Sequence, residues 1–248
     1  TLFKICRTLA FYTGLQKKDS YYWPHYTYQI YKVVATIIHV VYIFCLPSLC
    51  IALWQNIGKD MDTALALMKN ITFVAVVVFK TFIVQSDAIG KLVKAASEEE
   101  EIIRNLTDDA IRKMYKSNVN YCNRVTKVII TYLYGSGTVY VLDGLYRSYT
   151  YYKTHPNVKP EDPKPHTVFF WFPFDHNLYY KIALTYESFH ILQTLNYNAV
   201  AQSVVNSVMV FLKIELKVLQ HHIKAINSDT SNYQKCLIKC VKKHQQII

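Results

Sequence analysis

The sequence predicts an all-α protein, a polytopic bundle of transmembrane helices, and three observations lead to this prediction. Apolar residues make up 52% of the 248-residue chain and gather into long blocks. The chain carries a net charge of +11, and its basic residues are concentrated between those blocks, as in loops that flank membrane spans. Six Gly, seven Pro and six Cys are too few for a collagen-like or disulfide-rich protein. Because the basic residues follow the apolar blocks, we expect a lipid bilayer and no nucleic acid as partner.

The first predicted span covers residues 33–54, which contain no Asp, Glu, Lys or Arg. At a rise of about 1.5 Å per residue, a helix of this length crosses the roughly 30 Å hydrocarbon core. It follows the tyrosine-rich residues 1–32, so it lies too far from the start to be a signal peptide. Pro47 inside it is tolerated if neighbouring groups satisfy the freed backbone.

The second predicted span, residues 69–89, has Lys80 near its middle. A central Lys costs roughly 2.5 to 3.5 kcal/mol, but eleven Ile, Phe and Val residues each return about 0.3 to 0.6 kcal/mol, so insertion is favoured. We expect Lys80 to face a polar partner inside the bundle. The third predicted span, residues 128–149, places Asp143 and Arg147 one helical turn apart, where they can pair.

The fourth predicted span covers residues 180–212 and is rich in amides and hydroxyls. Most of its circumference is therefore expected to face protein or water. A soluble buried helix stays possible for this block alone.

The connections between the spans predict the orientation. Three segments, 1–32, 90–127 and 213–248, hold 20 basic residues, whereas the connections 55–66 and 153–179 hold four. Because Lys and Arg stay on the cytoplasmic side during insertion, we expect four crossings with a cytosolic N-terminus. Residues 1–248 are then a single membrane domain.

Two connections are predicted to have local structure. Residues 90–127 form a cytosolic helical loop in which Thr107 caps a second helix, and residues 213–248 form a cytosolic helical segment. Residues 153–179 form an outer lid loop that is extended, because five prolines lie in it.

No catalytic motif is found, so the chain is not expected to be an enzyme. Cys236, Cys240 and His244 recur every four residues, but three ligands in a reducing compartment do not predict a zinc site. We expect neither a metal nor a cofactor.

Three short stretches resemble insect odorant receptors, whose N-terminus is also cytosolic. Phe172-Pro173-Phe174-Asp175 is similar to the loop before the fourth helix of that family. Leu212-Lys213-Ile214-Glu215-Leu216 and the ending from Cys240 to Ile248 look like the cytosolic stretch after it.

The resemblance implies a seven-helix receptor that binds small volatile odorants and gates a cation channel. Its partner would be an olfactory co-receptor subunit in a hetero-oligomer, expected to be a tetramer, in the plasma membrane of an olfactory sensory neuron. Four of seven expected spans are present, so the resemblance implies a fragment that lacks the C-terminal helices. A gustatory receptor of the same superfamily, a membrane transporter and a G-protein-coupled receptor are the alternatives.

The resemblance also implies an apolar ligand pocket in the outer half of the bundle, on the second, third and fourth helices. Depth in the predicted spans selects nine candidate lining residues: Phe73, Val77, Val139, Leu142, Tyr146, Tyr186, Phe189, His190 and Gln193.

Overall fold

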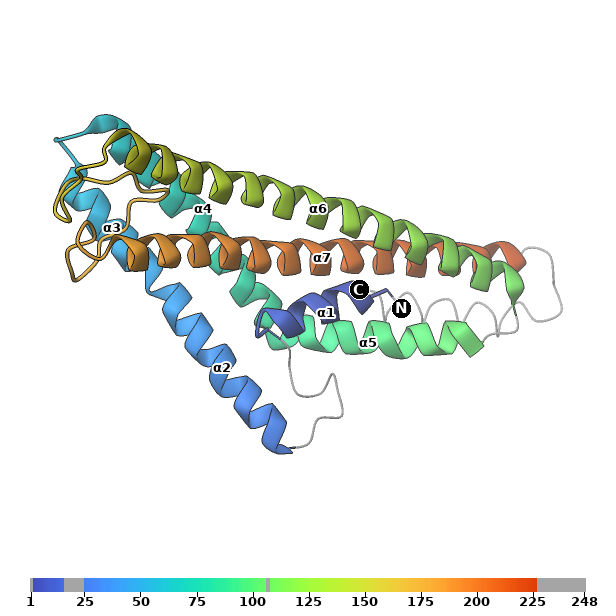
Figure 1. The fold of residues 1–248 in the computed structure, drawn as a ribbon. Coiled ribbons are helices and arrows are strands. Elements are labelled where there is room, and N and C mark those ends of the chain that lie inside the picture. The colour runs from blue at the N-terminus through green and yellow to red at the C-terminus, as the bar shows by residue number, and fades with distance from the viewer. Residues whose placement is uncertain (1, 16–24, 106–107, 227–248) are drawn as a thin grey trace. The chain divides into compact units, whose positions relative to one another are not determined.

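The computed structural model describes residues 2–15, 25–105 and 108–226, and no β-strand occurs among them (Figure 1). Four helical stretches are long and apolar enough to cross a membrane, which confirms the predicted all-α membrane bundle. The helices in chain order are α1 (Lys4–Tyr12), α2 (His25–Ile43), α3 (Cys45–Asn56), α4 (Met61–Gln85), α5 (Asp87–Asn105), α6 (Asp109–Thr154) and α7 (Tyr180–Ile226).

The first membrane stretch is built from two helices, α2 and α3, and extends from Thr27 to Asn56. The sequence predicted one span over 33–54, but the helix is interrupted at Phe44 and starts earlier. Pro47 explains the interruption, because it has no N–H to donate to the carbonyl of Ile43, where α2 ends. In α3 the proline occupies the first turn, where its missing N–H is tolerated.

The second stretch, α4, begins eight residues before the predicted span 69–89 and ends at Gln85. Asp60 sets the start, since its carboxylate accepts hydrogen bonds from the Thr63 hydroxyl (2.6 Å) and from the N–H groups of Asp62 (3.1 Å) and Thr63 (3.3 Å). These bonds, first that of the Thr63 hydroxyl, lower the pKa of Asp60. Gly58, with φ +79°, reverses the chain just before.

Asp108 caps the third stretch, α6. Its carboxylate accepts the N–H of Ala110 at 2.9 Å and of Ile111 at 3.3 Å, and the bond from Ile111 is the first cause of the lowered pKa of Asp108. The cap predicted at Thr107 lies outside the described residues. The helix continues without a break past residue 128, where the sequence analysis separated a cytosolic loop from a span.

The fourth stretch, α7, likewise continues past the predicted end of the span at residue 212. Between α6 and α7, residues 155–179 contain neither helix nor strand. We refer to residues 155–179 as the lid loop.

The described part of the chain divides into two compact units. Of the described residues, unit 1 combines 2–6, 86–105, 108–128 and 202–226, and unit 2 combines 7–15, 25–85 and 129–201. The interior of unit 1 includes Ile103, Ile111 and Ile214. The interior of unit 2 includes Leu49, Leu67, Val77, Tyr197 and Val200.

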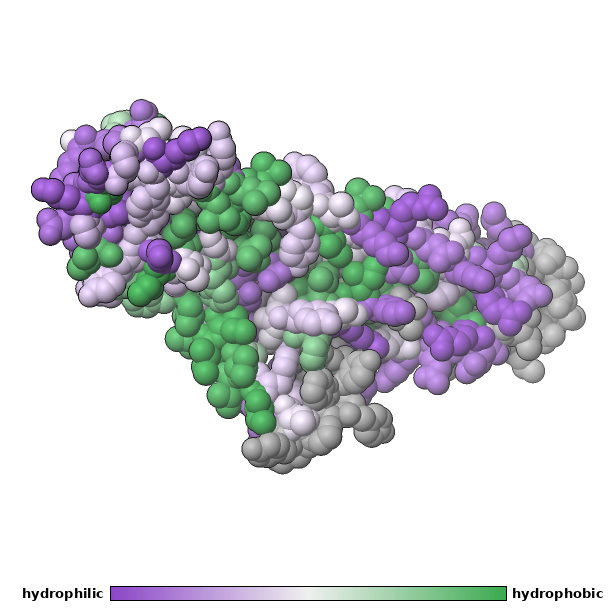
Figure 2. Space-filling view, in the orientation of Figure 1, coloured by the Kyte–Doolittle hydropathy of each residue, from purple (hydrophilic) through white to green (hydrophobic). Residues whose placement is uncertain are grey.

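The surface of α2 in unit 2 is strongly apolar (Figure 2). Val33, Ile37 and Val40 are each more than half exposed on it. A row of exposed aliphatic side chains on a helix of this length is typical of a surface that contacts lipid or another membrane helix.

Candidate functional site

Aromatic side chains gather in the interior of unit 2 around α7. Tyr197 of α7 stacks on His39 of α2, with ring centroids 5.4 Å apart, and contacts Tyr42 edge to face at 4.6 Å. His190, about two turns before Tyr197 on α7, also stacks on Tyr42, with ring centroids 5.4 Å apart. Aromatic pairs at these distances attract each other beyond the area that they bury.

The lid loop adds the ring of Phe170 to this group. Phe170 contacts the ring of His190 at 5.0 Å and that of Tyr186 at 5.3 Å, and Phe172 contacts Tyr186 at 5.7 Å. Phe170 is only 6% exposed although it lies in a loop. We call His39, Tyr42, Phe170, Tyr186, His190 and Tyr197 the aromatic cluster.

Few polar groups enter the aromatic cluster, and three of its buried polar atoms, His39 Nε2, His190 Nδ1 and the Tyr197 hydroxyl oxygen, have no hydrogen-bond partner among the described residues. Thr194 Oγ1 lies 2.8 Å from the carbonyl oxygen of His190, 3.2 Å from the Tyr42 hydroxyl and 3.5 Å from His190 Nε2. Among the described residues, none hydrogen-bonds the other ring nitrogen, Nδ1 of the buried His190. An unsatisfied ring nitrogen in an apolar surrounding is a group with which a ligand could form a hydrogen bond.

Several contacts hold the lid loop to the helices of unit 2. Trp171 exchanges hydrogen bonds with Ser48 of α3: its N–H donates to the Ser48 carbonyl at 3.4 Å, and the Ser48 hydroxyl donates to its carbonyl at 2.5 Å. Near the other end, the Tyr151 hydroxyl donates to the carbonyl of Pro163 at 2.7 Å. Within the lid loop itself, Asp175 accepts the N–H groups of Asn177 and Leu178, and these bonds lower its pKa.

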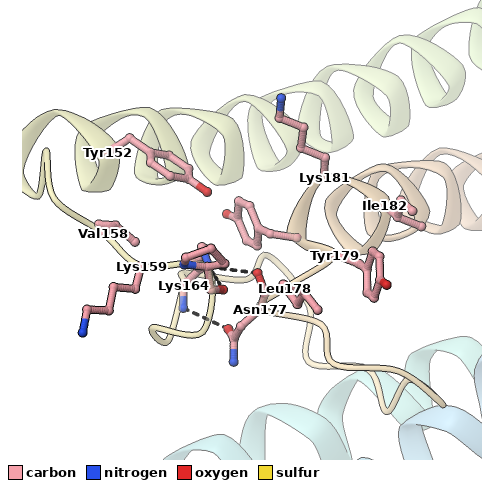
Figure 3. Close-up of a pocket in the computed structure, with 11 residues that line it drawn as sticks. Tyr152, Val158, Lys159, Lys164, Asn177, Leu178, Tyr179, Lys181 and Ile182 are labelled. Carbon is pink, nitrogen blue, oxygen red and sulfur yellow. Dashed lines mark hydrogen bonds between the residues drawn. The ribbon is translucent and has the colours of Figure 1, made fainter.

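A separate pocket of about 400 Å³ lies between the lid loop and the adjoining ends of α6 and α7 (Figure 3). The ammonium group of Lys164 beside it already donates to the carbonyl oxygens of Pro160 (2.5 Å), Asn177 (2.8 Å) and Asp162 (3.3 Å). All three donors are therefore used, so Lys164 has none left for a ligand. None of the nine candidate residues lines this pocket.

The nine candidates divide according to burial. Val77, His190 and Gln193 are buried, and Tyr186 and Phe189 are partly buried. The remaining four are between 48% and 68% exposed: Phe73, Val139, Leu142 and Tyr146. Depth along a helix was used to choose them, and depth does not determine which way a side chain faces.

Sequence reasoning missed Tyr42, Phe170 and Tyr197. Tyr42 belongs to α2, in the first membrane stretch, whereas the predicted pocket used only the second, third and fourth spans. Phe170 belongs to the lid loop. Tyr197 lies one turn beyond the depth chosen on α7. The aromatic run from Phe169 to Phe172 was a signal in the sequence that could have indicated Phe170.

Other polar residues have the partners that the sequence suggested. Lys80 donates to Asn198 Oδ1 at 3.3 Å, and Arg147 pairs with Asp143.

No group of three metal-ligating side chains occurs within 2–15, 25–105 and 108–226. Cys236, Cys240 and His244 lie outside those ranges. His221 contacts Asp108 at 3.1 Å.

Together, four membrane-length helical stretches and a buried aromatic cluster beneath an ordered loop define the class: a polytopic α-helical membrane protein. The sequence profile described as 7tm Odorant receptor matches residues 60–248, so the chain belongs to the odorant receptor family. This confirms the resemblance noted in the sequence.

The fold is similar to a solved structure, the insect olfactory receptor OR5 from Machilis hrabei, with a TM-score of 0.71 and 13% sequence identity. The similarity covers 99% of this chain and 62% of that receptor. The chain thus spans less than two thirds of the receptor's length. A search of curated protein sequences found no match.

Proposed function

We propose that this chain recognises small volatile organic molecules and contributes to the gating of a cation channel formed with a co-receptor subunit. The match of the odorant receptor family over residues 60–248 carries the proposal. We further propose that the protein resides in the plasma membrane of olfactory sensory neurons with its N-terminus in the cytosol.

The proposed ligand site lies around Tyr186, His190 and Gln193 on α7. Burial of an apolar ligand there is worth roughly 25 cal/mol per Å² of apolar surface, and His190 Nδ1 supplies a hydrogen bond that orients a ligand oxygen. Val77 and Phe189 belong to the same proposal. Phe73, Val139, Leu142 and Tyr146 line such a site only where another segment covers them.

The test is a recording of ligand-gated current from cells that express the receptor with a co-receptor subunit. A panel of volatile alcohols, ketones, esters and plain hydrocarbons separates ligands with an oxygen from those without one. His190→Phe keeps a ring of similar size but removes the nitrogen, so sensitivity to oxygen-bearing ligands should fall about fivefold to tenfold while that to hydrocarbons is retained. His155→Phe, an exposed change at the start of the lid loop, is the matched control.

The same recordings separate the alternatives. Responses to sugars or bitter compounds in place of odorants would indicate a gustatory receptor. Solute flux without a co-receptor would indicate a transporter. Current that requires the co-receptor and a volatile ligand supports the proposal, and its absence with a well-expressed receptor contradicts it.

Orientation has an independent test in the sequon Asn105-Leu106-Thr107. With a cytosolic N-terminus this sequon stays in the cytosol and receives no glycan. Glycan at Asn105, detected as a mobility shift removed by a glycosidase, would mean the opposite topology.

A further inference from the structure

Glu187 of α7 is an acid whose side chain is completely buried in unit 2. Its Oε1 lies 2.6 Å from Nδ1 of His166, which is itself 5% exposed. Its Oε2 accepts the backbone N–H of Thr167 at 2.8 Å and of Val168 at 3.2 Å. One carboxylate therefore binds three donors from consecutive residues of the lid loop. We call this arrangement the loop clamp.

The loop clamp favours a single geometry, because a buried carboxylate is costly in free energy unless its hydrogen-bond donors stay in place. An ionised carboxylate loses several kcal/mol when it is removed from water unless hydrogen bonds replace its hydration. Here three donors do so, and two of them are backbone N–H groups, whose directions are set by the path of the chain. Displacing the loop would leave a buried charge without its donors, which is costlier than losing a neutral contact.

The loop clamp lies two residues before Phe170, and the Ser48–Trp171 bonds lie one residue after it. The segment that carries Phe170 is thus held on one side by α7 and on the other by α3. Between these anchors the ring of Phe170 rests against His190 and Tyr186, with centroids 5.0 and 5.3 Å away. The ring of Phe170 is therefore positioned by hydrogen bonds to the backbone on both sides of it in the sequence, at Val168 and at Trp171.

We propose that Glu187 is a positioning residue that holds Phe170 over Tyr186 and His190 and thereby sets the size of ligand that the receptor accepts. The inference rests on the proposed function of this site. Glu187 acts through the lid loop and does not itself touch the ligand.

The first experiment measures the position of the loop without any ligand. Val168→Cys introduces a thiol at a 6% exposed position and keeps the backbone N–H that donates to Glu187. Cells that express the receptor are treated with a membrane-impermeant methanethiosulfonate reagent, and a receptor with native Val168 gives the background. Adding Glu187→Gln, which replaces an acceptor by an amide donor, should raise the labelling rate about tenfold or more.

Matched controls separate the clamp from general damage. Glu161→Gln makes the same chemical change at an exposed position of the lid loop and should leave labelling unchanged. Phe169→Cys is 45% exposed in the native loop and should label quickly with either residue at 187. If Glu187→Gln does not reach the cell surface, His166→Phe removes one donor, retains a ring, and should raise labelling in the same direction.

The second experiment measures ligand selectivity. The ratio of half-maximal concentrations for the smallest and the largest active compounds of the panel is compared between native receptor and Glu187→Gln. A purely structural role lowers the number of receptors at the surface and the maximal current, but leaves this ratio unchanged. Release of Phe170 should instead change the ratio severalfold in favour of large ligands.

Faster labelling together with a changed ratio supports the proposal. Unchanged labelling overturns the clamp, and faster labelling with an unchanged ratio overturns its role in selectivity. A receptor that answers no volatile compound overturns the proposed function, while the labelling result still decides whether Glu187 fixes the loop.

Discussion

The two longest helices, α6 and α7, have 46 and 47 residues and nevertheless have opposite environments. In the most apolar window of α6 only 11% of the residues are buried, whereas in that of α7 half are buried. The two windows have similar mean hydropathy, 1.2 in α6 and 1.4 in α7, so mean hydropathy does not account for the difference in burial.

Polar side chains explain this difference, because in a membrane they need partners that lipid does not supply. In unit 2, α7 meets Lys80 of α4 through Asn198, and Tyr134 of α6 through Asn196. In unit 1, Asn206 of α7 donates to Thr126 Oγ1 at 2.9 Å. We conclude that α7 organises each unit, while α6 presents much of its surface outward.

The largest expected contrast between the helices comes from two tyrosines of unit 2. Tyr197 of α7 is 1% exposed and Tyr132 of α6 is 74% exposed. Tyr197→Ala should lower the free energy of unfolding by about 3 to 5 kcal/mol, because it leaves a cavity beside His39 and Tyr42. Tyr132→Ala should change it by less than about 0.5 kcal/mol. Thermal unfolding in detergent micelles measures both, and equal effects would contradict the contrast.

Alanine substitutions at two glycines of α6 test where this helix packs closely against α7. A Cβ on Gly137 would lie 1.9 Å from Cδ1 of Leu195, whereas a Cβ on Gly135 meets nothing within 4 Å. Gly137→Ala should therefore cost about 1 to 2 kcal/mol as Leu195 is displaced. Gly135→Ala should stabilise the helix by up to about 1 kcal/mol through helix propensity. The same unfolding assay applies, and stabilisation by both changes would mean that Leu195 moves freely.

Much of the fold could be predicted from the sequence, because hydropathy reports the solvent of a segment. Long apolar blocks identified all four membrane stretches. The partner of Lys80 was expected from the cost of charge in lipid, and the pair of Asp143 and Arg147 from their spacing of one helical turn. Helix ends were less predictable. A span is limited by membrane thickness, but α6 already begins after the cap Asp108, and α7 continues past residue 212.

The candidate site could be predicted only in part. His190 and Gln193 were selected by their depth in the fourth predicted span, and both are buried in the structure. Phe170 and Tyr42 were not identified, because their proximity to α7 depends on the path of the lid loop and on the break at Phe44. Both are tertiary features that no local pattern specifies.

A smaller effect is expected from the polar contact between α4 and α7. Asn198→Leu leaves the Lys80 ammonium without its 3.3 Å acceptor and should cost about 1 kcal/mol, the usual size of a hydrogen bond between membrane helices. Lys80→Met in the same chain should recover much of that loss, since it removes the group left without a partner. A double-mutant cycle in micelles measures the coupling, and strict additivity would show that the two side chains do not interact.

The smallest effect is expected on the outer face of α6, at the ion pair of Asp143 and Arg147. Both side chains are about half exposed, at 51% and 52%, so solvent screens their attraction. Asp143→Asn should lower the free energy of unfolding by no more than about 0.5 kcal/mol, and high salt should abolish the difference. Arg147→Gln should have a similar effect because either change removes the same pair. A decrease in the free energy of unfolding as large as that of Asn198→Leu, and insensitive to salt, would contradict this. It would mean that another element covers this face of α6.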